Sequence, residues 1–61
     1  MEAALRDRIE AGEWASDEAL PTVAELAAEY HVSNTSVTRA LHTLEKAGLV
    51  RIVPRWGTFR V

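Results

Sequence analysis

Residues 22–48 read TVAELAAEYHVSNTSVTRALHTLEKAG, and this stretch contains two typical helix starts. Thr22, with Glu25 three residues later, matches a capping box, in which each side chain accepts a hydrogen bond from the other residue's backbone N–H. Ser33 is a second N-cap candidate, because serine favours caps over helix interiors. The two caps predict helices over about 23–30 and 34–47. A connection this short between two helices is typical of a helix-turn-helix motif.

Apolar residues recur at helical spacing along the second of these helices. The predicted buried stripe consists of Val37, Ala40, Leu41 and Leu44. The opposite face has hydroxyls near its N-terminus, cations further along and no acid. Its residues are Thr35, Thr38, Arg39, His42 and Lys46. Such a helix can enter the major groove of DNA and read bases with its N-terminal residues. An ordinary solvent-exposed face is the alternative interpretation.

The segment before this motif predicts one more helix and a short extended piece. Leu5 and Ile9 lie four residues apart in a run rich in alanine, which predicts a helix over about 2–11 that Gly12 ends. Leu20 precedes Pro21, and proline pushes the residue before it towards an extended backbone. We therefore expect a bend or a strand of one to three residues at Leu20.

The segment after Gly48 predicts a hairpin. Residues 49–53 and 58–61 are typical of strands, and PRWG at 54–57 is a candidate turn. The whole order predicts a mainly α fold with a small β-hairpin: a winged helix-turn-helix with three helices, a short strand near Leu20 and a C-terminal wing. We expect residues 1–61 to form this single domain, because a chain so short has room for one core.

Charge is unevenly distributed along the chain. Residues 1–30 carry a balance of −6 and residues 31–61 a balance of +4, although the whole chain has a formal net charge of −2. The basic half coincides with the third predicted helix and the hairpin, which favours a polyanion such as DNA as the partner. The acidic half favours the alternative, a winged helix used for protein–protein interaction. Its candidate docking residues are Glu13, Asp17, Glu18, Glu25 and Glu29.

Several function classes have no support in the sequence. The chain lacks cysteine, which excludes disulfides, cysteine zinc sites and thiol catalysis. It contains no nucleophile elbow, phosphate loop or metal-ligand cluster. It also has no apolar run long enough to span a membrane and no secretory signal. We therefore expect no enzyme activity, no metal or cofactor, no membrane partner and a cytoplasmic location.

The two tryptophans receive different interpretations. Trp14 lies in a polar segment and is expected to pack in the core. Trp56 lies at the hairpin tip, where it either folds back on the wing, contacts DNA or contacts a partner. Arg51 and Arg60 alternate with apolar residues and are expected to point outward. There they either form a cationic strip with Arg55 or keep the hairpin soluble.

Four segments resemble, in order and spacing, the DNA-binding domain of the GntR family. They are LPTVAELA at 20–27, VSNTSVTRAL at 32–41, LEKAGLV at 44–50 and GTF at 57–59. The resemblance covers about Leu5 to Val61. It implies a winged-helix transcription regulator that is dimeric on a palindromic operator, usually with a C-terminal effector-binding domain. We expect no effector domain in this chain, and a homodimer that forms on double-stranded DNA.

The sequence departs from the family pattern at three arginines that the family commonly uses on DNA. Their positions hold Ala24, Asn34 and Thr38 here. Partial replacements are available, because Asn34 can bond an adenine edge and Arg39 can reach guanine or a phosphate. Arg55 can replace the cation of the family's wing.

The predicted DNA-binding residues therefore belong to the helix caps, the third helix and the wing. They are Thr22, Ser33, Asn34, Thr35, Ser36, Thr38, Arg39, His42, Lys46, Arg55, Trp56, Gly57 and Thr58.

Overall fold

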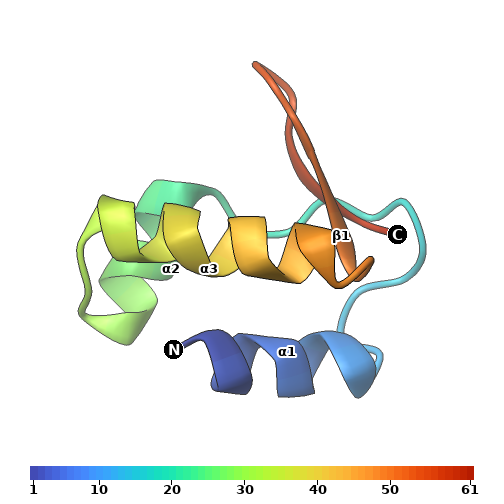
Figure 1. Cartoon of the computed structure of the whole chain (residues 1–61), viewed down its shortest axis with the longest axis horizontal. Helices are drawn as coiled ribbons and strands as arrows, with labels where there is room; N and C mark the ends of the chain where they lie inside the picture. The colour runs from blue at the N-terminus through green and yellow to red at the C-terminus, as the bar shows by residue number, and fades with distance from the viewer.

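The computed structural model describes residues 1–61 as three helices followed by a two-stranded antiparallel hairpin (Figure 1). The elements are α1 (Glu2–Glu10), α2 (Val23–Tyr30), α3 (Asn34–Lys46), β1 (Val50–Val53) and β2 (Gly57–Arg60). Helix α3 contacts α1, α2 and β1, and the hairpin rises from its C-terminal end, away from α1. This arrangement confirms the predicted winged helix-turn-helix, and the hairpin with its loop, residues 50–60, is called the wing below.

Both predicted helix caps are present. The Thr22 hydroxyl accepts a hydrogen bond from the Glu25 N–H at 3.1 Å, and the Glu25 carboxylate accepts one from the Thr22 N–H at 2.8 Å. The Ser33 hydroxyl accepts from the Ser36 N–H at 3.2 Å. Between the two helices, His31 adopts a left-handed conformation with φ of 56°. This reversal allows α3 to begin only four residues after α2 ends.

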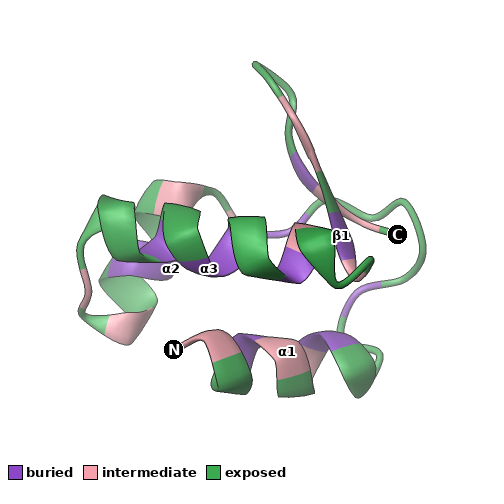
Figure 2. Ribbon diagram, viewed as in Figure 1, coloured by how far each residue is buried: buried purple, intermediate pink, exposed green.

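The core lies where the three helices and the base of the wing meet (Figure 2). Its fully buried side chains are Leu5, Ile9, Leu26, Val37, Leu41, Leu44 and Val50. The predicted stripe of α3 is buried, and Trp14 is buried as well, which confirms its expected role in the core. Burial of these apolar side chains is the main term that stabilises a domain without disulfides.

The segment between α1 and α2 runs beside β2. Ala19 forms a single β-bridge with Phe59, and the Leu20 N–H donates to the Thr58 carbonyl at 2.8 Å. The Arg60 N–H donates to the Glu18 carbonyl at 2.9 Å. These bonds confirm the short extended piece near Leu20 and cover the edge of β2 that β1 leaves free.

The register of the hairpin corrects one sequence-based expectation. Val50 pairs with Arg60 and Arg51 pairs with Phe59, and cross-strand partners share one face of a hairpin. Arg51 is exposed as expected, but Arg60 lies on the same face as the buried Val50. The Arg60 guanidinium turns back and donates to the Ile9 carbonyl at 3.2 Å, at the C-terminal end of α1. The outward orientation expected for Arg60 was wrong because the pairing placed it on the inner face.

Candidate nucleic-acid interface

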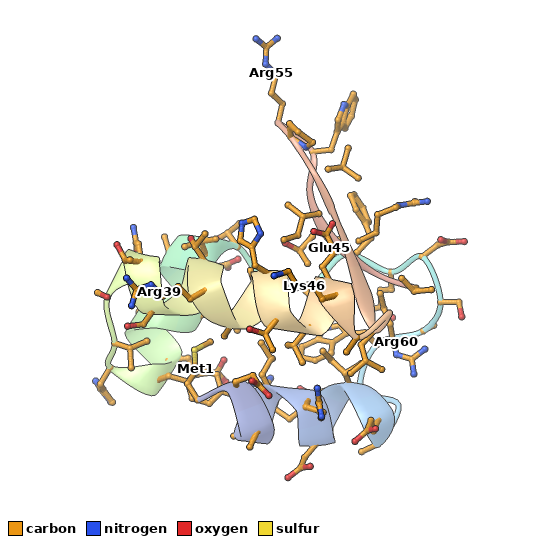
Figure 3. The ribbon with its side chains drawn as sticks, in the orientation of Figure 1. Met1, Arg39, Glu45, Lys46, Arg55 and Arg60 are labelled. Carbon is orange, nitrogen blue, oxygen red and sulfur yellow. The ribbon has the colours of Figure 1, made fainter.

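The outer face of α3 is fully available to a partner. Every α3 residue predicted to bind DNA is exposed: Asn34, Thr35, Ser36, Thr38, Arg39, His42 and Lys46. Arg39 and Lys46 lie along this side of the helix in Figure 3, and neither forms an ion pair. A cation that has no carboxylate partner in its own chain can interact with phosphate without first breaking an internal contact.

At the N-terminus of α3, the capping side chains are hydrogen-bonded to each other, and the two residues between them are exposed. The Ser33 hydroxyl donates to the Ser36 hydroxyl at 3.1 Å as well as accepting from its N–H, so these two side chains are engaged with each other. Asn34 and Thr35 follow the cap, and both are exposed in the first turn. The first turn of a helix carries free N–H groups and a partial positive charge, which favours an anion such as phosphate.

The wing tip is a short, well-defined turn. The Trp56 N–H donates to the Val53 carbonyl at 3.1 Å, and Arg55 has φ of 72°. With Pro54 as the second residue and a positive φ at the third, the turn resembles type II. Arg55 stands at the outer end of the wing in Figure 3 and forms no ion pair. Trp56 is 79% exposed, which excludes the alternative in which it folds back on the wing.

The remaining wing residues predicted to bind DNA have different environments. Gly57 is exposed at the start of β2, with φ of 118°, a conformation that favours glycine. Thr58 is buried instead, at 7% exposure, because it pairs with Ile52 on the inner face of the hairpin. Its hydroxyl therefore has little surface to offer DNA, and we remove Thr58 from the candidate interface.

Glu45 links α3 to the wing, a role that the sequence did not reveal. Its carboxylate accepts a hydrogen bond from the Ile52 N–H at 3.0 Å, and Figure 3 shows the side chain between α3 and the hairpin. The two residues lie on either side of the turn at Gly48, so no local sequence signal connects them. The bond helps to set the position of the wing relative to α3.

Arg8 forms the densest charge cluster of the chain, away from the candidate interface. Its guanidinium donates to the Glu13 carboxylate through two bonds of 2.7 Å, to Tyr30 Oη at 2.8 Å and to Glu29 at 3.2 Å. It also lies over the Trp14 ring, 4.9 Å from the centroid. The hydrogen bonds with Glu13 and then Tyr30 raise the pKa of Arg8 further above its usual value. The same bond from Arg8 lowers the pKa of Glu13.

The acids that favoured a protein-binding module all have partners within the chain. Glu13 and Glu29 bind Arg8. The Glu18 carboxylate accepts from the Ala15 N–H at 2.8 Å, and Glu25 completes the capping box. Asp17 lies 3.9 Å from Arg51. These five acids therefore contribute to the fold, whereas the cations of α3 and the wing tip form no ion pair.

One open hollow of about 280 Å³ lies between the start of α1 and α3, and Met1, Glu2 and Arg39 contribute to its lining. No group of three or more histidines and acids is arranged to hold a metal ion. Each helix is too short and too polar to cross a bilayer.

Helices α2 and α3 are joined by a tight turn, α3 has an exposed cationic face, and a hairpin wing follows it. Together these features define a winged helix-turn-helix DNA-binding domain. The model of the gntR family of bacterial regulatory proteins matches residues 1–59. The chain belongs to this family and is the DNA-binding domain of a GntR-type transcriptional regulator.

Two curated relatives are transcriptional regulators from Bacillus subtilis (strain 168). The HTH-type transcriptional regulator TreR is 38% identical over 54 residues, which cover 88% of this chain and 23% of TreR. The uncharacterized HTH-type transcriptional regulator YcxD is 33% identical over 57 residues, which cover 93% of this chain and 13% of YcxD. The chain thus spans less than a quarter of either relative.

Two solved structures share the fold. A GntR family transcriptional regulator from Listeria monocytogenes superposes with a TM-score of 0.90 at 25% identity, over 98% of this chain and 53% of that protein. A transcriptional regulator from Oenococcus oeni superposes with a TM-score of 0.84 at 23% identity, over 98% of this chain and 50% of that one. The second likeness concerns the fold alone.

Proposed function

We propose that this domain binds double-stranded DNA sequence-specifically, with α3 in the major groove and the wing against the neighbouring backbone or minor groove. One observation carries the proposal. The cations Arg39, Lys46 and Arg55 are exposed and form no ion pair, whereas most acids of the first half have partners within the fold: Glu2, Glu13, Asp17, Glu18, Glu25 and Glu29. A net charge of −2 therefore coexists with a surface suited to a polyanion.

Individual residues receive distinct roles in this proposal. Asn34, Thr35 and Thr38 face outward on the first half of α3 and read base edges, as N-terminal residues of recognition helices do. Arg39 reaches a guanine or a phosphate, while His42 and Lys46 contact the backbone. Thr22, Ser33 and Ser36 act through their caps, which hold the N-terminal amides of α2 and α3 towards phosphates. Gly57 has no side chain and allows the wing backbone to approach the DNA closely.

The resemblance to the family supports a proposal for the assembly on DNA. We propose that two copies bind a palindromic operator, because the two-fold symmetry of a dimer matches that of a palindrome. The domain then serves transcription regulation in the bacterial cytoplasm, where its DNA is found.

Selection of bound duplexes from a random pool tests the proposal most directly. An enriched sequence is expected, and the spacing of repeated half-sites reports the dimer. A salt titration on the enriched duplex follows. If about three to five phosphates are neutralised, log K should fall with log salt at a slope of about −3 to −4.5. Absence of duplex binding at about 50 mM salt, with an intact circular dichroism spectrum, would refute DNA binding.

Arg39 provides a residue-level test with a matched control. Arg39→Ala should cost about 1–3 kcal/mol of binding free energy on the enriched duplex if Arg39 reads a base. Arg6→Ala removes the same charge from α1, outside the candidate interface, and should leave the affinity nearly unchanged. Equal affinities of wild type and Arg39→Ala would remove Arg39 from the interface.

A further inference from the structure

Trp56 is the most unusual feature of the surface. It is 79% exposed, and the only other large exposed hydrophobic residue is Val61, at 58%. The Trp14 ring is covered by the Arg8 guanidinium, whereas no cation of the chain lies over the Trp56 ring. A tryptophan this exposed presents a large aromatic surface to water, which is typical of a residue that contacts a partner.

The turn presents Trp56 in a defined position. The ring of Pro54 fixes its own φ angle two residues before Trp56. The hydrogen bond from the Trp56 N–H to the Val53 carbonyl then closes the turn. Below the turn, the Ile52–Thr58 pair of the wing is held by the Glu45–Ile52 hydrogen bond and by the burial of Thr58. A ring on a rigid, anchored turn loses little conformational freedom when it binds.

The charge around the ring favours a nucleic acid over a protein or a second copy. No acid occurs between Lys46 and Val61, and the residue next to the ring is the unpaired Arg55. Two wing tips brought together would place like charges side by side, which is unfavourable. A duplex instead offers phosphates to Arg55 and flat base faces to Trp56.

We propose that Trp56 inserts between two base pairs at the wing's contact, where it partially unstacks one step and bends the duplex, while Arg55 binds the adjacent phosphate. This inference rests on the proposed DNA binding and adds its mode at the wing. Apolar side chains that enter a base step kink DNA in this way. Pyrimidine–purine steps unstack most easily, so the wing contributes sequence preference without reading a base edge.

Such indirect readout suits the composition of this recognition surface. Ala24, Asn34 and Thr38 stand where the family pattern has arginines, which leaves fewer groups for direct contacts with bases. A preference for a flexible step at a fixed distance from the bases read by α3 restores part of the lost discrimination. The enriched duplexes should therefore contain TA or CA/TG steps at a constant position beside each half-site.

Substitutions at Trp56 separate stacking from charge. On an enriched duplex, Trp56→Ala should weaken binding about 5- to 150-fold, the range expected for one base–aromatic stack, and Trp56→Phe should weaken it less. Trp56→Lys adds a cation and removes the ring, so it should also bind more weakly than wild type. Val61→Ala, at the other exposed hydrophobic residue, should bind like wild type.

Fluorescence reports insertion directly. Trp14→Phe leaves Trp56 as the only tryptophan, and its emission should be quenched and shielded from acrylamide when duplex is added. If Trp14→Phe fails to fold, the difference between wild type and Trp56→Phe supplies the same signal. A 2-aminopurine placed at the flexible step should brighten with wild type but not with Trp56→Ala, and duplex ends labelled for energy transfer should approach each other only with wild type.

The outcomes distinguish insertion from DNA binding itself. Wild type that does not bind duplex overturns the proposed function and the inference with it. Wild type that binds while Trp56→Ala is equal in affinity and bending overturns insertion alone. Tighter binding by Trp56→Lys shows that the tip acts through charge and overturns insertion. Loss of a DNA-free dimer in Trp56→Ala, measured by sedimentation, assigns the ring to self-association and also overturns it.

Discussion

The molecule contains two arginine–tryptophan pairs, and their environments are opposite. One is Arg8 with Trp14, and the other is Arg55 with Trp56 at the wing tip. Arg8 binds two carboxylates and a tyrosine hydroxyl and covers the buried Trp14 ring. Arg55 forms no ion pair, and Trp56 is 79% exposed. The same residue types therefore close the fold in one region and remain open to a partner in the other.

The difference depends on what surrounds each combination. Glu13, from the segment after α1, and Glu29 and Tyr30, from the end of α2, meet at Arg8. The wing tip instead carries no acid and projects away from the core. Residue type alone does not distinguish a structural cation from a binding cation. The presence or absence of internal partners does, and it can be tested by exchanging the same residues in both regions.

The two tryptophans should show the largest contrast in stability. Trp14→Ala should lower the free energy of unfolding by about 3–5 kcal/mol, because it leaves a cavity where a large ring packed. That is a large share of the roughly 3–9 kcal/mol expected for a domain of this size. Trp56→Ala should change it by less than about 0.5 kcal/mol. Urea denaturation followed by circular dichroism measures both, and similar losses would contradict the contrast.

The two arginines should differ next. Arg8→Met should cost about 2 kcal/mol, since it removes several charged hydrogen bonds but leaves Glu13 and Glu29 partly hydrated. The melting temperature should fall by about 8–16 °C. Arg55→Met should leave the melting temperature nearly unchanged and reduce the salt slope of DNA binding by about 1. A thermal shift of equal size in both variants would show that Arg55 is also structural.

Substitutions at Glu45 test whether DNA binding by the wing depends on the hydrogen bond that joins the wing to α3. Glu45→Ala should lower the unfolding free energy by about 1 kcal/mol, because the Ile52 N–H loses its acceptor, and should weaken DNA binding through a displaced wing. Glu45→Gln removes the same charge but keeps an acceptor oxygen, so it serves as the matched control. Better DNA binding by Glu45→Gln than by Glu45→Ala is expected. Equal binding would mean that the charge, and not the hydrogen bond, matters.

The smallest expected effect is a pH dependence of stability that arises from the hydrogen bonds between Arg8 and Glu13. Arg8 lowers the pKa of Glu13 in the folded state, so the ionised carboxylate stabilises the fold at pH values above the ordinary carboxyl pKa. This contribution is lost as the pH falls through the lowered pKa. Between about pH 6 and pH 3, wild type should therefore lose more stability than Glu13→Gln. Parallel denaturation curves for the two proteins across this range would disprove the coupling.

Local signals in the sequence predicted most of the fold. The caps at Thr22 and Ser33 set where α2 and α3 begin, and the apolar spacing of α3 separated its buried stripe from its exposed face. These features involve residues three to seven positions apart, so they can be recognised without knowledge of the tertiary structure. Trp14 was assigned to the core for another reason, because it occupies a position where the GntR family tends to place an apolar residue.

Errors arose where pairing across the chain mattered. The inward positions of Thr58 and Arg60 follow from the hairpin register and from the segment around Leu20 that covers β2. A shift of one residue in a strand reverses which side chains face the core, so alternation alone left the orientation open. The Glu45–Ile52 bond was missed because it joins residues on either side of a turn.

The amino-acid sequence by itself determined the order of the elements, the helix caps and the face of α3 that carries hydroxyls and cations. Periodicity and capping are local properties, and they survive any arrangement of the elements around them. The tertiary structure decided which charges are paired within the fold and which remain free, and it left the Trp56 side chain largely exposed. Charge pairing and ring burial depend on distances between residues far apart in the chain, and only folding brings such residues together.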